Sequence, residues 1–586
     1  MKARVTSIRI AVCFCLLWLS GILNAQEDEL GTETVTVVRS YTPTVSDAYK
    51  INPFPTLNDS IVGQKIPIRY SIQSVPVAST FTPAKGRAAE VERKEREKLY
   101  NTYAALGLGN YANAQADFYT SLDFDRGKQL LDIGLNHLSS QGDIEGTPLD
   151  TDFYNTALDV TYARRDRDWD WNIGAGLEHR RYNWYGLPDA ALEAPGLDGI
   201  DEAQDYFRAE LEGKVSLPET YLKELSLTAR GFWDAVNSAE NRFVLNSVLE
   251  FPVTGETFNL GITLDYVGGD FKNAPLTSLQ QEPGISYGYF QGGLHPSLQL
   301  LRDDLKLDLG ASLVYNLDVE NSESDFYLYP VIRASYALSE EVAIIYGGVE
   351  GGLIQNSYYQ FSKENPFVSP TLSVLPTDRQ YEAYLGIRGQ LLPELTYNLK
   401  GTYRAENFLP LFLLNPQNEF RTDDKGYMFG NSFRLFYDDV KTLGLFGELQ
   451  LAVNRNFTLG LNATVNDYDT ETDNPAWNLP NIQGTLFLDY EIGDSWYFGG
   501  SLFYVGERED LATLAVQNVS PEDFPASIVT LDGFLDANIH VGYHLNDQLT
   551  IFARGSNLAN NAYQRWANFR VQGLQVLAGV SYRFDL

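Results

Sequence analysis

The chain has 586 residues, a formal net charge of −33 at pH 7 and an aromatic content of 13%. The negative charge argues against a nucleic-acid partner, because phosphate binding requires a surplus of Lys and Arg. The mean hydropathy of −0.23 excludes a bundle of membrane helices. It does not exclude a membrane β-barrel, in which only every second strand residue must be apolar. The aromatic content is typical of a barrel with aromatic belts at both membrane surfaces.

Residues 1–25 are predicted to form a secretory signal peptide. A basic start is followed by the apolar run 10–23, which is shorter than the roughly 20 residues of a membrane-spanning helix. Cleavage is expected after Ala25. Both cysteines, Cys13 and Cys15, lie in this segment, so we expect the mature chain to form neither disulfides nor thiolate metal sites.

Residues 26–101 are predicted to form an extended, Pro-rich periplasmic segment before the first strand. The prolines that disfavour a sheet-based domain here are Pro43, Pro53, Pro55, Pro67, Pro76 and Pro83. A short charged helix is expected over 85–101. Two interpretations of it stay open: a solvated helix supported by opposite charges, or a docking element for a periplasmic protein.

Beyond residue 101, apolar and polar residues alternate along the chain. The windows 305–315, 457–465 and 535–543 show this pattern clearly. A period of two predicts a strand with one apolar and one polar face. In a soluble sandwich the apolar face points to a protein core, whereas in an outer-membrane barrel it points to lipid and the polar face lines the lumen.

Two features favour the barrel. The strands are long enough to cross a bilayer when tilted, and short connections alternate with long ones, as in barrels with periplasmic turns and outer loops. We therefore predict an all-β fold over residues 102–586, a transmembrane antiparallel β-barrel of about 22 strands with both ends in the periplasm. The predicted strands are 103–111, 113–125, 128–139, 152–164, 168–183, 204–217, 224–236, 240–252, 257–268, 284–300, 305–317, 325–337, 341–354, 379–391, 395–406, 441–453, 457–468, 481–492, 496–507, 531–544, 548–558 and 573–585.

Residues 431–439 also have a strand-like pattern. Counting them as a barrel strand would break the alternation of short and long connections, so we interpret them as the arm of an extracellular hairpin. Several polar residues are predicted to face the lumen and to contact whatever fills it. They are Lys306, Asp308, Glu448, Gln450, Asp536 and Arg583.

The C-terminal stretch 548–584 resembles the end of TonB-dependent outer-membrane receptors. The matching residues are Phe552, Ala553, Arg554, Asn557, Leu558, Tyr563, Gly573, Tyr582, Arg583 and Phe584. The chain departs from that ending because Asp585 and Leu586 follow the terminal aromatic residue. The resemblance implies a receptor-type barrel in the outer membrane of a Gram-negative bacterium, surrounded by outer-membrane lipid. It also implies transport of solutes or nutrients, with TonB or a surface lipoprotein as partners.

The N-terminal segment differs from the family. Receptors of this kind fill the barrel with a plug domain, and residues 26–101 are too short and too rich in proline to form one. We therefore expect a barrel without its own plug. One segment resembles a TonB box, which in the family pairs as an added strand with a periplasmic domain of TonB. Its residues are Glu33, Thr34, Val35, Thr36, Val37 and Val38; an ordinary extended segment is the alternative.

Catalytic and cofactor sites find little support in the sequence. His540 and His544 have helical metal-ligand spacing, but on a strand four residues span about 13 Å, too far to chelate one ion; we expect them to line the lumen. Acidic residues over 467–473 are interpreted as solvated loop charges, with Ca²⁺ binding as the alternative. No catalytic motif appears, so no enzyme activity and no cofactor are predicted.

Two functions follow from an unplugged barrel of this width. The first is a receptor-like transport protein, and the alternative is a non-transporting scaffold subunit of an outer-membrane complex. An empty lumen would leak solutes, so we expect a filler: the N-terminal segment, infolded long loops or a partner. Loop aromatics such as Tyr358, Tyr359, Phe361 and Trp477 are predicted either to stack on sugars or to pack within the loops.

Overall fold

The structure is a computed structural model that describes residues 98–586 except 189–198, 274–283, 340–341, 419–424 and 516–524. The chain divides into two compact units, Met1–Lys94 and Glu95–Leu586. The signal peptide and the TonB-box-like segment 33–38 lie outside the described residues, as does nearly all of the predicted periplasmic segment. Their assignments therefore stay predictions.

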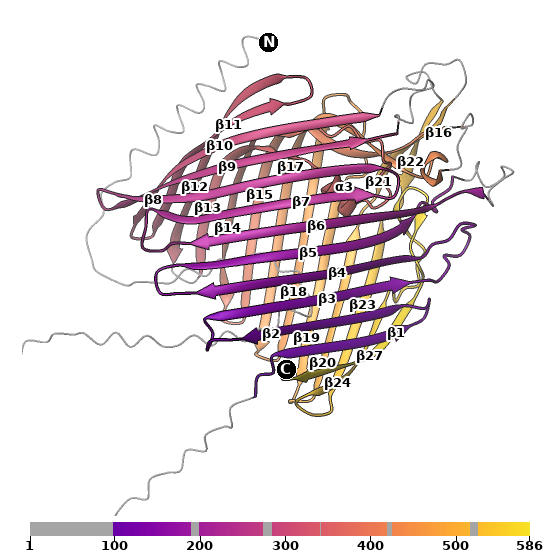
Figure 1. Cartoon of the computed structure of the whole chain (residues 1–586), viewed down its shortest axis with the longest axis horizontal. Coiled ribbons are helices and arrows are strands. Elements are labelled where there is room, and N and C mark those ends of the chain that lie inside the picture. Colours follow the sequence, from indigo (N-terminus) through magenta and orange to yellow (C-terminus); the bar gives the residue numbers. More distant parts are fainter. Residues whose placement is uncertain (1–97, 189–198, 274–283, 340–341, 419–424, 516–524) are drawn as a thin grey trace, which may run out of the picture. The chain divides into compact units, whose positions relative to one another are not determined.

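The second unit is almost entirely β-sheet (Figure 1). Its 22-stranded sheet consists of β1 (Thr102–Gly109), β2 (Ala114–Asp123), β3 (Gln129–Ser140), β4 (Phe153–Arg165), β5 (Asp170–Asn183), β6 (Ala203–Ser216), β7 (Leu222–Asp234), β8 (Ser238–Val253), β9 (Glu256–Phe271), β10 (Ile285–Arg302), β11 (Leu305–Asp318), β12 (Glu323–Ser339), β13 (Ala343–Ile354), β14 (Thr377–Leu392), β15 (Leu395–Leu414), β17 (Phe433–Asn454), β18 (Phe457–Thr470), β19 (Ile482–Ile492), β20 (Trp496–Val505), β23 (Phe534–His544), β24 (Leu549–Ser556) and β27 (Gln575–Phe584).

The sheet closes on itself as an antiparallel barrel. Each strand pairs with the next in chain order, and β1 pairs with both β2 and β27. The closing register joins Thr102 to Phe584 and Leu106 to Val580. Closure leaves no unpaired sheet edge, which is what a sheet in lipid requires. The predicted fold class and strand number are confirmed.

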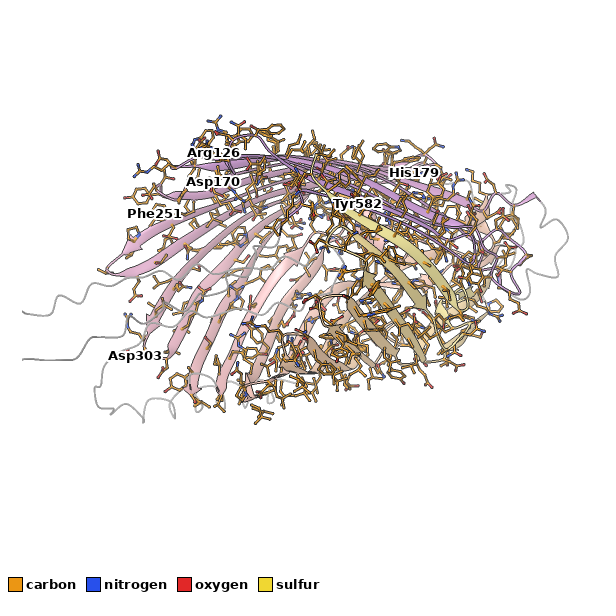
Figure 2. All side chains as sticks on the ribbon, turned by 90° about the horizontal axis from the view of Figure 1, so that it is seen from below. Arg126, Asp170, His179, Phe251, Asp303 and Tyr582 are labelled. Atoms are coloured by element: carbon orange, nitrogen blue, oxygen red, sulfur yellow. The ribbon has the colours of Figure 1, made fainter. Side chains whose placement is uncertain are left out.

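The two ends of the barrel differ. One end carries short turns such as 254–255, 303–304 and 455–456, together with the start of β1 and the end of β27. The other carries the long connections, including 184–202, 355–376, 415–432, 506–533 and 557–574, and also three short connections, 110–113, 235–237 and 319–322. Figure 2 shows the turn-end residues Arg126, Asp170 and Asp303 away from His179 near the other end. We call the second end the mouth.

The outer face of the wall is apolar and exposed. On β18, Leu461 and Val465 are each 46% exposed, and on β11, Leu309 and Tyr315 are also exposed. The residues between them belong to the opposite face, where Ser312 is buried. This is the alternation expected when one face contacts lipid and the other lines a lumen. None of the described helices is long and apolar enough to span a membrane.

The hairpin around 431–439 is longer than predicted. β15 continues to Leu414 and β17 starts at Phe433, and their extensions pair from Leu409↔Asp438 to Leu414↔Phe433. The segment is therefore an arm of the β15–β17 hairpin and not an additional barrel strand. The predicted strands, ending at 406 and starting at 441, were too short. The β15 half of the arm, residues 409–414, is apolar on both faces, which hides the period of two, and residues 431–439 were predicted as a hairpin arm separate from the barrel strand.

Small elements occupy the long connections. Helix α3 (Tyr358–Glu364) lies between β13 and β14, and the 3-10 helix η4 (Gly426–Met428) lies between β15 and β17. Short strands β16 (Gln417–Asn418), β21 (Arg508–Ala515) and β22 (Ala526–Leu531) form one sheet, and β25 (Gln564–Trp566) pairs with β26 (Phe569–Arg570). Figure 1 shows α3, β16, β21 and β22 together at the mouth.

Exchanging Leu461 for Arg tests which face contacts lipid. Leu461 lies in mid-strand on the exposed apolar face, whereas the adjacent Asn462 lies on the other face. A charge in mid-bilayer destabilises such barrels by about 2–4 kcal/mol. We expect Leu461→Arg to lower the free energy of unfolding by that amount in urea titrations in lipid vesicles. Asn462→Arg should have a much smaller effect, and equal effects would contradict the assignment.

Candidate functional site

A buried cluster of large apolar residues fills part of the mouth. We call it the mouth cluster; its members are Trp184, Tyr206, Phe232, Val267, Phe271, Tyr287, Tyr289, Tyr358, Tyr359, Phe361, Phe367, Val368, Leu372, Val374, Phe412, Leu414, Tyr427, Phe433, Leu531, Trp566, Ala567 and Phe569. Burying one such side chain contributes about 1.5–3 kcal/mol. A cluster of this size therefore holds the loops as one packed unit.

The mouth cluster joins walls that lie far apart around the barrel. Tyr206 and Phe232 belong to β6 and β7, whereas Phe412 and Phe433 belong to β15 and β17. Ring contacts link the two sides through the loops. Phe232 meets Tyr358 of α3 at 5.1 Å between centroids, and Phe361 of α3 meets Phe412 at 6.0 Å. The connection 355–376 thus links two sides of the barrel wall at the mouth. That the loops fill the lumen stays a prediction.

A buried carboxylate holds the start of α3 against the wall. Glu240 on β8 accepts hydrogen bonds from the backbone N–H of Tyr358 at 2.5 Å and from that of Tyr359 at 3.4 Å. It also accepts from the Tyr287 hydroxyl at 2.6 Å. Only 1% of Glu240 is exposed. A carboxylate at the first turn satisfies N–H groups that have no partner within the helix.

A second buried carboxylate binds the same helix through a side chain. The Tyr358 hydroxyl donates to Asp234 Oδ2 at 2.8 Å. Asp234 also accepts from the backbone N–H groups of Val236 and Ser238 in the β7–β8 turn. Burial raises the pKa of Tyr358 well above its usual value, which further favours the protonated hydroxyl that donates this bond.

Two arginines of the wall also contact the helix. Arg180 on β5 donates to the Ser362 carbonyl at 3.1 Å and to its hydroxyl at 3.0 Å. Arg230 on β7 lies over the Tyr359 ring at 4.3 Å, a cation–π contact. The seven residues of α3 are thereby held by two carboxylates and two guanidinium groups from the inner wall. We call Arg180, Asp234 and Glu240 the α3 anchor.

The other face of the β15–β17 arm packs on a neighbouring loop. Leu411 and Leu413 bury against Trp477, with Leu511 alongside. At this contact the fully buried Asp510 accepts from the backbone N–H groups of Leu414 and Leu511 at 2.9 and 2.8 Å and from the Asn478 side-chain amide at 2.9 Å. Burial raises the pKa of Asp510 to about 6.

Below the mouth, the inner wall carries ion pairs within strands and between neighbouring strands. Arg208 binds Glu210 at 2.8 Å, and Glu210 also binds Arg230 at 2.5 Å. Arg333 binds Glu350 at 2.5 Å on the other side. A hollow of about 400 Å³ lies beside this pair, lined also by the buried residues Gln291 and Ser312. The wall is polar, and many of its charges are paired.

The residues predicted to face the lumen lie on the strand faces opposite the exposed leucines. Asp308 accepts from Arg333 at 3.5 Å, and Asp536 accepts from the Tyr563 hydroxyl at 2.8 Å. Glu448 and Gln450 lie on β17, and Lys306 and Arg583 lie on β11 and β27. These six residues are spread over four strands, β11, β17, β23 and β27, and do not form one site. Their contact with a filler stays a prediction.

The histidine pair lies on β23, as expected. His544 Nδ1 bonds the Thr550 hydroxyl at 2.7 Å, and the Tyr497 ring lies 6.0 Å from the His540 ring and 5.4 Å from that of His544. Within the described ranges, no group of three or more His, Cys, Asp or Glu residues is arranged to hold a metal ion.

The loop aromatics pack within the loops. Tyr358, Tyr359, Phe361 and Trp477 are all buried, which leaves their rings unavailable for stacking on a ligand in this conformation. The α3 anchor was missed because Glu240 has the pattern of any inward polar strand residue. Its partner Tyr358 lies 118 positions away, and no local signal connects the two.

The fold is shared with outer-membrane receptors. The siderophore receptor PirA from Acinetobacter baumannii superposes with a TM-score of 0.60 at 13% identity, covering 83% of this chain and 81% of that one. The ferric-catecholate import receptor Fiu from E. coli K12 gives 0.58 at 10% identity, covering 83% and 82%. The copper transporter OprC gives 0.57 at 15% identity, also covering 83% and 82%.

This chain has the barrel fold of outer-membrane receptors. The closed 22-stranded sheet and the shared fold carry that conclusion, and the apolar, exposed outer face is the face expected to contact lipid. No protein-family model matches the sequence, and no curated protein matches it. At identities of 10–15%, the neighbours define the fold and leave the substrate open.

The buried Asp510 predicts that the arm is weaker at neutral than at acidic pH. A carboxyl whose pKa is raised by folding binds a proton more tightly in the folded state, so stability falls as pH rises from about 4 to 6. The effect amounts to at most about 3 kcal/mol. Hydrogen exchange of the Leu414 and Leu511 amides, corrected for intrinsic rates, should show protection falling over this range.

Asp510→Asn is the matched control. Its side-chain oxygen keeps both backbone donors. Its new NH₂ group loses the bond from Asn478, whose amide nitrogen also donates to the Phe412 carbonyl, so the protection of this variant is expected to be lower overall. Protection in this variant should be independent of pH between 4 and 7. If the hydrogen-exchange protection of the Leu414 and Leu511 amides in the wild-type chain were equally independent of pH, the account would be contradicted.

Proposed function

We propose that this protein is a receptor-like outer-membrane β-barrel that transports solutes or nutrients across the outer membrane without a plug domain of its own. The observation that carries the proposal is the mouth cluster, which bridges the lumen where a receptor would admit its substrate. In this account the infolded connection 355–376 acts as the barrier, and α3 is its central element. The structural neighbours are described as a siderophore receptor, a ferric-catecholate import receptor and a copper transporter, which supports small solutes as the substrate class.

The polar inner wall supports passage once the mouth opens. Many of its charges are paired between adjacent strands, as for Arg230 with Glu210 and Arg333 with Glu350. Paired charges bind solutes weakly, because each guanidinium already has a carboxylate partner. A hydrated, weakly binding wall is suited to conduction.

In this proposal the N-terminal segment, residues 26–101, acts in the periplasm. The start of β1 and the end of β27 lie at the turn end, so residues 26–101 would enter the periplasm. There, the segment 33–38 would pair with TonB by strand addition. A surface lipoprotein would be a partner at the mouth.

A second candidate function is a non-transporting scaffold in an outer-membrane complex. The rigidity of the mouth favours it, since three separate buried groups fix a helix of only seven residues. A permanently closed barrel would present its loops and its N-terminal segment to partners without moving solutes.

Releasing α3 distinguishes the two functions. A hydrogen bond to a charged group contributes about 1.5–3 kcal/mol, so losing one shifts the open-to-closed ratio of the mouth by roughly 10- to 100-fold. We expect the wild-type chain in planar bilayers to show no large, permanently open pore. Glu240→Ala should then open in discrete events.

Glu448→Ala serves as the control, because Glu448 also lies on the lumen side of its strand but outside the α3 anchor. It should stay as closed as the wild type. If Glu240→Ala folds normally and remains closed, transport through this mouth is contradicted. Co-purification of stable partner proteins with the closed barrel would then favour the scaffold.

A further inference from the structure

A hollow lies on the inner wall next to the mouth cluster. Its volume is about 400 Å³, within the roughly 300–1,000 Å³ range of ligand sites. Five neighbouring strands, β9 to β13, supply its lining. Gln291 lines it from β10, two positions along the same strand face from Tyr289 of the mouth cluster. A solute that passes the mouth on this side of the barrel would therefore meet the hollow.

Small residues create the hollow. Gly293 and Gly352 line it, together with Ser297 and Ser312. A Cβ built on Gly352 would meet no atom within 4 Å, so the backbone there borders open space. Strands β9 to β13 pair with one another around the hollow. The wall is therefore recessed because long side chains are missing, and the sheet itself stays closed.

The carboxylates and the guanidinium group at the hollow are already paired. Arg333 binds Glu350 at 2.5 Å and Asp308 at 3.5 Å. Glu350 also accepts a hydrogen bond from the Tyr384 hydroxyl at 2.9 Å. A charged solute would have to compete with these charge-assisted bonds, whereas an uncharged solute leaves them in place.

Apart from the His295 ring, the other polar groups of the lining are uncharged. They are the hydroxyls of Thr263, Ser297 and Ser312 and the amide of Gln291. Gln291 is 6% exposed, and its Nε2 has no hydrogen-bond partner among the described residues. Leaving a buried donor unpaired is unfavourable, and the terminal torsion of a Gln side chain is soft. An acceptor oxygen that enters the hollow would therefore be bound by this amide.

Aliphatic side chains complete the lining. Val314 on β11 and Val331 on β12 both border the hollow, and Val314 is buried. The site thus combines neutral hydrogen-bonding groups with aliphatic surface. A sugar ring has the same two features, since its edge carries hydroxyl groups that both donate and accept and its faces carry C–H groups.

We infer that this hollow is a binding site for an uncharged, hydroxyl-rich solute with the chemistry of a carbohydrate. The inference rests on the proposed transport function, for which it names the substrate class. Gln291 donates to an oxygen of the solute, Ser297 and Ser312 exchange hydrogen bonds with its hydroxyls, and the two valines contact its C–H faces. Binding is weak, because a transported solute must also leave the site.

Saturation-transfer NMR with defined sugars tests this inference. The mature chain would be studied in a detergent without a sugar headgroup, at about pH 8, above the pKa of an ordinary imidazole. The neutral probes are glucose, galactose, mannose, N-acetylglucosamine, maltose and lactose, and the charged probes are glucuronate and glucose 6-phosphate. We expect neutral sugars to receive several-fold more saturation than the two anions.

Gly352→Leu should fill the hollow and reduce the saturation of the neutral sugars several-fold. The matched control is Gly174→Leu on β5, where a Cβ would approach the Thr161 hydroxyl no closer than 3.4 Å; it should bind like the wild type. Gln291→Leu removes the unpaired amide at similar volume and should also weaken binding. It replaces Gly352→Leu if that variant fails the heat-dependent mobility shift of a folded barrel.

Three results would overturn the inference. They are no saturation of any neutral sugar in both the wild type and Glu240→Ala, anions that bind as well as neutral sugars, and unchanged binding in the folded variants of the hollow. The assay measures binding without transport. A failure here therefore leaves the channel recordings of Glu240→Ala untouched, and a mouth that stays closed in those recordings contradicts transport without changing the binding result.

Discussion

The structure depends on the pairing of its first and last strands. In a bilayer no water is available to bond backbone N–H and C=O groups, so a sheet can span it only when every strand has two neighbours. The pairing of β1 with β27 meets that requirement with a register only eight residues long. Once the sheet closes, the period of two in the sequence assigns each side chain to lipid or to lumen.

The inner face of the same wall has two chemical zones. Ion pairs between adjacent strands line the lumen away from the mouth, whereas aromatic residues near the strand ends face the infolded loops. Glu240 and Asp234 lie at the border between these zones, where a buried carboxylate needs several donors to be tolerated. The helix α3 and the β7–β8 turn supply those donors. The barrier and the wall therefore stabilise each other, and weakening one carboxylate affects both.

Much of the barrel could be predicted from the sequence because a strand between lipid and lumen must alternate apolar and polar residues. Alternating windows such as 305–315 and 457–465 correspond to β11 and β18, and the number of strands was correct. The β15–β17 arm was predicted too short because its two faces pack against different loops, so Leu411 and Phe412 are both buried. This alternation is lost where both faces of a strand pack against other parts of the protein, as in the arm.

The packing of the loops at the mouth could not be predicted, because it depends on contacts between residues far apart in the sequence. Tyr358 was recognised as a loop aromatic, but its helix and its partners Asp234 and Glu240 are set by tertiary contacts more than 100 residues apart. A seven-residue helix is also too short for a periodic signal. The pattern of residues 33–38 lies outside the described part of the chain, so energy coupling through TonB rests on that pattern alone.

The account stands on the outward face of the barrel being covered by acyl chains. The most direct measurement is refolding of the mature chain from urea by dilution into buffer alone or into buffer with lipid vesicles. Folding is monitored by the shift in electrophoretic mobility on heating and by β-sheet circular dichroism. The account predicts a folded barrel only when lipid or detergent is present. A monomeric, fully folded chain in buffer alone would contradict it.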